Sequence, residues 1–205
     1  MPALIITLSV LLLFFIVWLI LVGTKRDKSL EKYASVRFAH RGLHGDGVAE
    51  NSMTAFRLAT ERGFGIELDV RLSKDGELVV FHDDTLTRVA NFDGLVKDYT
   101  VAQLKEMSLS GTADTVPTFR EVLELVGGRV PLLVEIKEDA GDKAVSDKTA
   151  EVLAEYCGDY IVESFNPLSL ANIKKKLPVS LTLNVPNLTK KKPGLSLKVL
   201  WVSTP

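Results

Sequence analysis

The stretch that most constrains the fold runs from Gly65 to Asp84 and reads GIELDVRLSKDGELVVFHDD. In its first half, the carboxylates Glu67 and Asp69 alternate with apolar residues, so a β-strand here places both carboxylates on one face. A Lys-Asp-Gly turn then leads to a second apolar strand that ends at His82. Two like charges on a largely apolar strand are costly unless a cation or hydrogen-bond donors compensate them, which favours a divalent metal site.

A second feature is an apolar run at residues 3–22, long enough as a helix to cross a hydrocarbon core about 30 Å thick. We expect a transmembrane helix at residues 1–24, followed by a linker at 25–35. The alternative of a cleaved signal peptide is disfavoured because no Lys or Arg precedes the run. No other run approaches this apolar length, so we expect a single-pass protein, and the positive-inside rule predicts that its main domain lies in the cytoplasm because basic residues follow the run. These basic residues are Lys25, Arg26 and Lys28.

From residue 36 onward, strand-like and helix-like patterns alternate, which predicts an α/β fold with a parallel sheet and a site at the carboxyl ends of its strands. A helical and loop-like excursion at 85–125 interrupts the alternation. The formal net charge is -1, and nothing in this balance suggests nucleic acid, so no such partner is expected. The alternating segments are VRFAHRG, TAFRLATERG, the Gly65–Asp84 stretch, VPLLVEIKE, a helix at 142–157, YIVESF, LSLANIKKK and VSLTLNV.

The strand VEIK repeats the spacing of the first carboxylate pair, because Glu135 and Lys137 also fall on one face. Charged side chains facing inward near strand ends are rarely structural, since desolvation usually costs more than the Coulomb attraction returns. A plain intrastrand ion pair is the alternative for Glu135 and Lys137. A solvated edge face is the alternative for Glu67 and Asp69.

Each of two histidines, His40 and His82, ends an apolar strand and precedes a polar loop. An imidazole titrates near neutral pH, so both are candidates for proton transfer. His44 lies within a Gly-rich loop and is interpreted as structural.

Together these segments resemble the glycerophosphodiester phosphodiesterase family over roughly residues 36–170. The resemblance rests on AHRG, AENSMTAF, GIELDVRLSKDGELVVFHDDTLTR, PTFREVLELV and LLVEIK, which occur in the family's order. It implies a TIM (β/α) barrel at 36–186, with the excursion at 85–125 as the family's inserted segment. The implied activity is metal-dependent hydrolysis of glycerophosphodiesters to an alcohol and glycerol 3-phosphate, at the cytoplasmic face of a membrane.

The resemblance also implies roles for individual residues. His40 and His82 would be the general acid and base, in an order that the sequence leaves open. Arg41 and Lys137 would hold the phosphate oxygens. The carboxylates would hold a Mg²⁺ or Ca²⁺ ion. The implied metal-site residues are Glu67, Asp69 and Glu135, with Glu50 close to them.

The C-terminal part departs from the family pattern, because fewer strands follow than a complete barrel of about 250 residues requires. We therefore expect an incomplete barrel and a divergent tail at 187–205, although KVLWV within that tail is compatible with a seventh strand. There are two alternatives to the hydrolysis of glycerophosphodiesters. One is a truncated, inactive relative that binds lipid headgroups or a partner. The other keeps the chemistry but acts on lysophospholipids.

Overall fold

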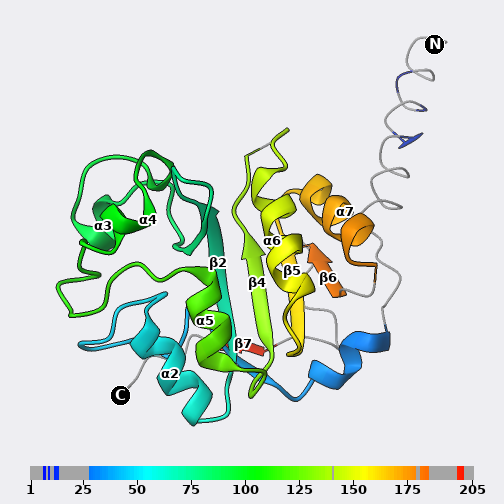
Figure 1. Cartoon of the computed structure of the whole chain (residues 1–205). Helices are drawn as coiled ribbons and strands as arrows, with labels where there is room; N and C mark the ends of the chain where they lie inside the picture. The colour runs from blue at the N-terminus through cyan, green and yellow to red at the C-terminus, as the bar shows by residue number, and fades with distance from the viewer. Residues whose placement is uncertain are drawn as a thin grey trace. The chain divides into compact units, whose positions relative to one another are not determined.

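The predicted alternation of strands and helices is present in the computed structural model (Figure 1). The structure describes residues 7, 9, 12–13, 28–139, 141–178, 181–184 and 198–200. Among these residues, no helix has the length and apolar character that a membrane crossing requires. The predicted transmembrane helix at 1–24 lies outside the described residues apart from isolated positions.

The described residues from Tyr33 onward belong to one compact unit. The strands are β1 (Arg37–Ala39), β2 (Gly65–Leu72), β3 (Leu78–Val80), β4 (Leu132–Ile136), β5 (Tyr160–Ser164), β6 (Leu181–Asn184) and β7 (Lys198–Leu200). The helices are η1 (Lys28–Tyr33), α2 (Met53–Glu61), α3 (Thr87–Ala90), η2 (Val96–Asp98), α4 (Val101–Leu104), α5 (Phe119–Val126), α6 (Ala144–Ala154) and α7 (Pro167–Lys176).

The strands form a sheet in the order β6-β5-β4-β2-β1-β7, with every neighbouring pair parallel. Helices α2, α5, α6 and α7 cover the face that is turned to the viewer in Figure 1. The neighbouring pairs β1–β2, β4–β5 and β5–β6 are successive along the chain, and a helix connects the strands of each pair, as in the TIM-barrel-like α/β fold that the sequence predicts. The segment predicted as a divergent tail contributes β7, which pairs with β1.

Strand β3 departs from the parallel pattern, because it pairs antiparallel with β2. The amide of Phe81 donates to the carbonyl of Asp69, whereas the next carbonyl of β2, that of Val70, accepts from Lys137 beside β4. β3 therefore occupies the edge of β2 that the short strand β1 leaves free. The hairpin of β2 and β3 brings Phe81 beside Asp69, and His82 is the next residue along the chain.

The alternation of side chains along β2 separates the core from the site. Ile66, Leu68 and Val70 belong to the main hydrophobic core, which also contains residues of the covering helices. The carboxylates between them, Glu67 and Asp69, therefore face the opposite side of the sheet.

Local signals explain the helix boundaries. The hydroxyl of Ser52 accepts from the amide of Ala55 at 3.1 Å and caps α2. Thr118 and Glu121 form a capping box that begins α5.

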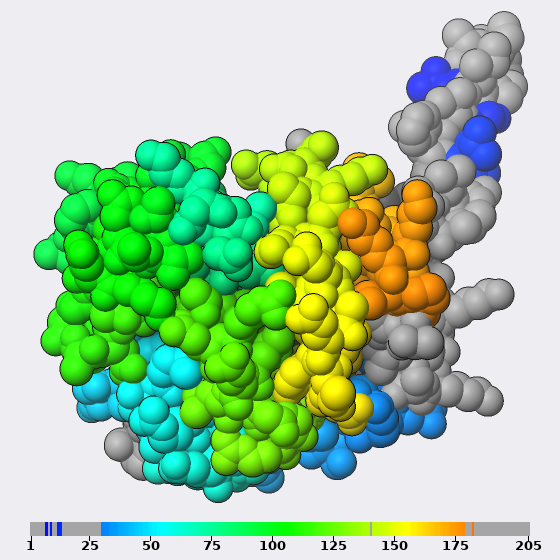
Figure 2. Space-filling view, in the orientation of Figure 1, coloured from blue at the N-terminus to red at the C-terminus, as the bar shows by residue number. Residues whose placement is uncertain are grey.

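The excursion after β3 has a core of its own, formed by residues between Val79 and Val116 together with Ala49. Phe119 and Val122 of α5 instead join the main core, so α5 packs with the barrel helices rather than with the excursion. In Figure 2 the excursion forms the green region beside α6, and α7 in orange lies next to α6.

Candidate active site

Three carboxylates from two neighbouring strands meet on the sheet face opposite the covering helices. Asp69 of β2 is the register partner of Glu135 of β4, and Glu67 lies two residues before Asp69. Their side chains offer ligand oxygens that all lie within 4.8 Å of one another. The edge-face alternative for Glu67 and Asp69 is wrong, because these residues are only 2% and 0% exposed.

Burial and repulsion between like charges disfavour the ionised forms of Glu67 and Glu135. Burial raises the pKa of Glu67 well above its usual value, and the negative charge of Asp69 raises it further. Burial also raises the pKa of Glu135, although Lys137 opposes that change. An all-oxygen donor set with excess negative charge suits a hard divalent cation, so the residues present fit Mg²⁺ or Ca²⁺.

Lys137 provides a cation within this group. Its Nζ lies 2.7 Å from Oε1 of Glu135 and 3.1 Å from Oδ1 of Asp69. The intrastrand ion pair therefore exists, but Lys137 also bridges two strands. Burial lowers the pKa of the Lys137 ammonium, yet Asp69 and Glu135 raise it above its ordinary value, so the side chain remains charged.

The loop after β1 holds Arg41 against the same carboxylates. The Arg41 amide donates to Oε2 of Glu67 at 2.7 Å, and its Nη1 donates to Oε1 of Glu50 at 2.9 Å. Nε of Arg41 lies 3.7 Å from Oδ2 of Asp69. Gly42 has φ of +80°, and a Cβ there would lie 2.8 Å from Cβ of Ala55, so glycine allows α2 to approach this loop.

Asn51 is a site residue to which the sequence analysis gave no role. Its Nδ2 donates to Oδ2 of Asp69 at 2.9 Å, and its amide donates to the carbonyl of Arg41 at 2.9 Å. Its φ of 51° is left-handed, a conformation that asparagine tolerates better than most residues. Asn51 therefore connects the Arg41 loop to the carboxylate group.

His40 directly follows β1 and lies beside the carboxylates, with its Nε2 4.0 Å from Oε2 of Glu67. Burial, followed by the nearby Arg41 guanidinium, lowers the pKa of His40 to about 4. The imidazole is therefore neutral at pH 7 and is able to accept a proton.

His82 is oriented by a chain of polar contacts. Its Nδ1 lies 2.6 Å from Oδ1 of Asp83, and Oδ2 of Asp83 accepts from Arg88 at 2.6 Å. Burial raises the pKa of Asp83, but hydrogen bonds from Arg88 and His82 outweigh this and lower it to about 2. Because Asp83 is ionised, Nδ1 of His82 is the donor, which leaves Nε2 for proton exchange.

Glu50 is not one of the three carboxylates whose oxygens lie within 4.8 Å of one another, and two arginines bind it instead. Both Nη atoms of Arg88 donate to its oxygens, at 2.9 and 2.7 Å, in addition to the bond from Arg41. These bonds, together with Arg41, lower the pKa of Glu50 in spite of its burial. Arg88 sits within the excursion, and no sequence pattern marked it as a site residue.

Glu163 of β5 is another residue that the sequence reasoning missed. It is the register partner of Glu135, is 4% exposed, and its Oε2 has no hydrogen-bond partner in the described part of the chain. Burial, followed by the charges of Glu135 and Asp69, raises the pKa of Glu163 to about 8. A charged residue inside the apolar strand YIVESF, near the strand end, was the available signal.

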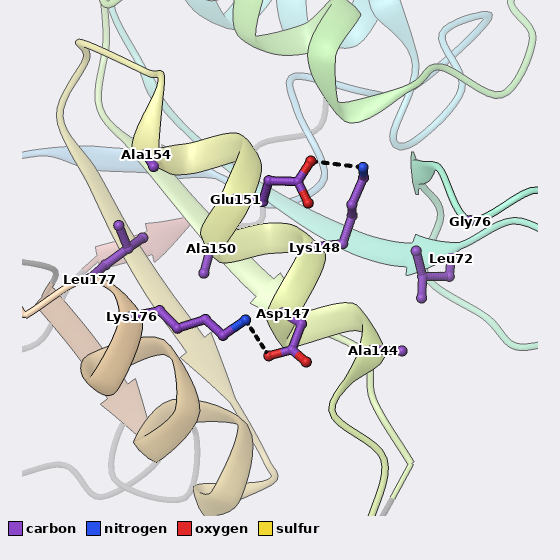
Figure 3. Close-up of a pocket in the computed structure, with 10 residues that line it drawn as sticks. All are labelled: Leu72, Gly76, Ala144, Asp147, Lys148, Ala150, Glu151, Ala154, Lys176 and Leu177. Carbon is purple, nitrogen blue, oxygen red and sulfur yellow. Dashed lines mark hydrogen bonds and ion pairs between the residues drawn. The ribbon is translucent and has the colours of Figure 1, made fainter.

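A pocket of about 590 Å³ lies away from these residues, between α6, α7 and the turn after β2 (Figure 3). Ion pairs on its lining join Lys176 to Asp147 at 2.8 Å and Lys148 to Glu151 at 3.0 Å. None of the predicted site residues lines it, so this pocket is separate from the candidate chemistry.

Comparison with known proteins shows the family of the chain. The profile of the glycerophosphoryl diester phosphodiesterase family matches residues 40–202. The chain belongs to this family. Among curated relatives, a glycerophosphodiester phosphodiesterase of Caldanaerobacter subterraneus subsp. tengcongensis is 39% identical over 152 residues, which are 68% of this chain and 62% of that protein. One from Bacillus altitudinis is 40% identical over 153 residues, 69% of this chain and 62% of its own.

A solved structure of the same kind supports the fold. An Oleispira antarctica phosphodiesterase in complex with the product sn-glycerol-3-phosphate is 29% identical, with a TM-score of 0.69 over 75% of this chain and 67% of that one. This family member thus shares the TIM-barrel-like architecture described above. The chain spans 62% of the length of each of the two curated relatives.

Proposed function

We propose that this chain hydrolyses glycerophosphodiesters to an alcohol and glycerol 3-phosphate with the help of a divalent cation. The observation that carries the proposal is the gathering of buried carboxylates, cationic side chains and histidines at one end of the sheet. Family membership and the product named in the Oleispira antarctica structure support this substrate class.

The carboxylates Glu67, Asp69 and Glu135 would hold Mg²⁺ or Ca²⁺ through oxygen atoms. When bound, the cation would supply positive charge against the negative charge that develops on the phosphoryl oxygens. Arg41 and Lys137 would bind those oxygens from the protein side. Glu50, held by Arg41 and Arg88, would fix the orientation of the Arg41 guanidinium.

Phosphodiester hydrolysis requires that the attacking oxygen lose a proton and that the leaving alcohol gain one. His40, whose lowered pKa keeps it neutral, would accept a proton. His82, with Nδ1 bonded to the ionised Asp83, would exchange a proton through Nε2. Asp83 would also stabilise the imidazolium form of His82, as a carboxylate does for a catalytic histidine.

We also propose that residues 3–22 anchor the protein in a membrane as a single span. The support is the apolar length of this run and the basic residues that follow it. The positive-inside rule then favours a cytoplasmic location for the domain.

A lysophospholipid is a second candidate substrate, and one observation favours it. Phe165 and Leu168, directly after β5, are 62% and 59% exposed. The Phe165 ring lies 6.0 Å from Nζ of Lys137, so this apolar surface begins beside the proposed phosphate-binding residue. An acyl chain of a lipid substrate would bury such surface.

Alanine substitution of the histidines tests the proposal. His40→Ala and His82→Ala should each lower the rate of glycerophosphocholine hydrolysis by about 10²–10⁴-fold, because each removes a proton-transfer group. His44→Ala is the matched control and should retain activity. Full activity in both of the first two variants would refute the assigned chemistry. A full chain that releases neither choline nor glycerol 3-phosphate would favour the inactive, headgroup-binding alternative.

A further inference from the structure

Glu163 is a buried carboxylate that the proposed chemistry does not use. It lies on β5 opposite Glu135, which lies opposite Asp69 on β2, so the three side chains form a row on one face of the sheet. Among the described residues, the group whose oxygens lie close enough to share an ion contains Glu67, Asp69 and Glu135 but not Glu163. Glu163 therefore lies beside the proposed cation site rather than within it.

The second observation is an unmet hydrogen-bonding requirement. Glu163 is 4% exposed, and its Oε2 accepts no hydrogen bond in the part of the chain that the structure describes. The nearby ammonium of Lys137 lies against Glu135 and Asp69 instead. Leaving a buried acceptor without a donor is costly, so such a group points to a donor that arrives with a ligand.

We propose that Glu163 accepts a hydrogen bond from a hydroxyl group of the bound substrate, so that the site selects phosphate esters of a polyol such as glycerol. This inference rests on the proposed function, because it assumes that the phosphate binds beside Arg41 and Lys137. A free hydroxyl is a donor, and a carboxylate is a strong acceptor for it. A site built to bind a hydroxyl discriminates against an analogue without one, because the analogue leaves the buried acceptor unpaired.

Calorimetric titration of the full chain, with saturating Mg²⁺ or Ca²⁺, tests this with two ligands. Glycerol 3-phosphate carries two hydroxyl groups, and n-propyl phosphate carries none. We expect the wild-type chain to bind glycerol 3-phosphate about 10- to 100-fold more tightly, the ordinary range for a hydrogen bond to a charged group. The ratio of the two affinities is the readout, because the same cation and phosphate contacts contribute to both.

Two substitutions separate the acceptor from the volume of the side chain. Glu163→Met removes both oxygens at similar volume and should bring the affinity ratio close to one. Glu163→Gln keeps one neutral acceptor and should give an intermediate ratio. Glu124→Met, at an exposed position on α5, is the matched control and should keep the wild-type ratio. Thermal unfolding should show equal or higher Tm for both Glu163 variants, since each removes an unpaired buried carboxylate.

The inference is overturned if the wild-type chain shows no difference between the two ligands, including the case in which it binds neither. It is also overturned if Glu163→Met keeps the wild-type ratio. Hydrolysis of glycerophosphocholine is measured in parallel. Selective binding without hydrolysis would refute the proposed function and leave the role of Glu163 standing, so the two failures are distinguishable.

Discussion

Replacing Lys137 with methionine should destabilise the protein far more than an ordinary lost ion pair. The Lys137 side chain is 13% exposed and lies against Glu135 and Asp69, which are 9% and 0% exposed at their side chains. Breaking a buried pair by removing one partner costs about 3–5 kcal/mol, because the other charge stays buried without compensation. For a domain of this size that corresponds to a fall in Tm of about 6–20 °C.

The matched control is Lys105→Met, which breaks a bond of similar length in an exposed setting. Nζ of Lys105 lies 2.6 Å from Oε1 of Glu121, but the two side chains are 38% and 40% exposed. Such a pair contributes about 0–1 kcal/mol, so the Tm should fall by no more than about 4 °C.

A divalent cation should reduce the defect of Lys137→Met, because it compensates the same carboxylates. At 100-fold above its Kd a ligand adds about 2.7 kcal/mol to the folded state. The cation should bind the variant more tightly than the wild type, since the competing ammonium is gone. Scanning calorimetry at increasing Mg²⁺ or Ca²⁺ should therefore show the Tm gap closing. Equal Tm losses in the two lysine variants, or a gap that the cation leaves unchanged, would refute this reasoning.

Other predictions address the cation, the pH and the membrane. Glu67→Gln and Asp69→Asn should lower divalent-cation affinity while the fold persists, and unchanged affinity in calorimetric titration would reject these ligands. With chelator present, no cation lies beside Glu163 to favour its charged form. Glu163→Gln should then gain stability over wild type as pH rises from about 4.5 to about 8, because the unfolded carboxyl ionises in this range while burial keeps the folded, cation-free one protonated. Urea unfolding across this range measures the gain, and a gain that shrinks with pH would contradict it. Deleting residues 1–26 should release the protein from the membrane fraction, and persistent sedimentation with membranes would count against the anchor.

The sequence predicts which charged side chains share one face of a strand, because side chains alternate between the two faces with a period of two. That period placed Glu67 with Asp69, and Glu135 with Lys137, and the structure has both pairs on the site side of the sheet. The same reasoning applied once more to YIVESF would have found Glu163. The direction of a strand leaves no mark on its period, so the antiparallel pairing of β3 was not predictable in this way.

Local sequence patterns predict little of the polar network around the site. Arg88 lies in the excursion and reaches Glu50, which is 38 positions away along the chain. Asn51 directly precedes Ser52, the cap of α2, but its bond to Asp69 depends on how α2 packs beside β2. Such contacts follow from tertiary packing, which spacing in the sequence does not encode.

The most direct test of the account is choline release from glycerophosphocholine by the full chain, measured before chelation, after chelation and after return of Mg²⁺ or Ca²⁺. The account predicts that release stops with the chelator, resumes with the cation and yields glycerol 3-phosphate as the second product. Release that continues unchanged in excess chelator would contradict it. So would the absence of release at every cation concentration.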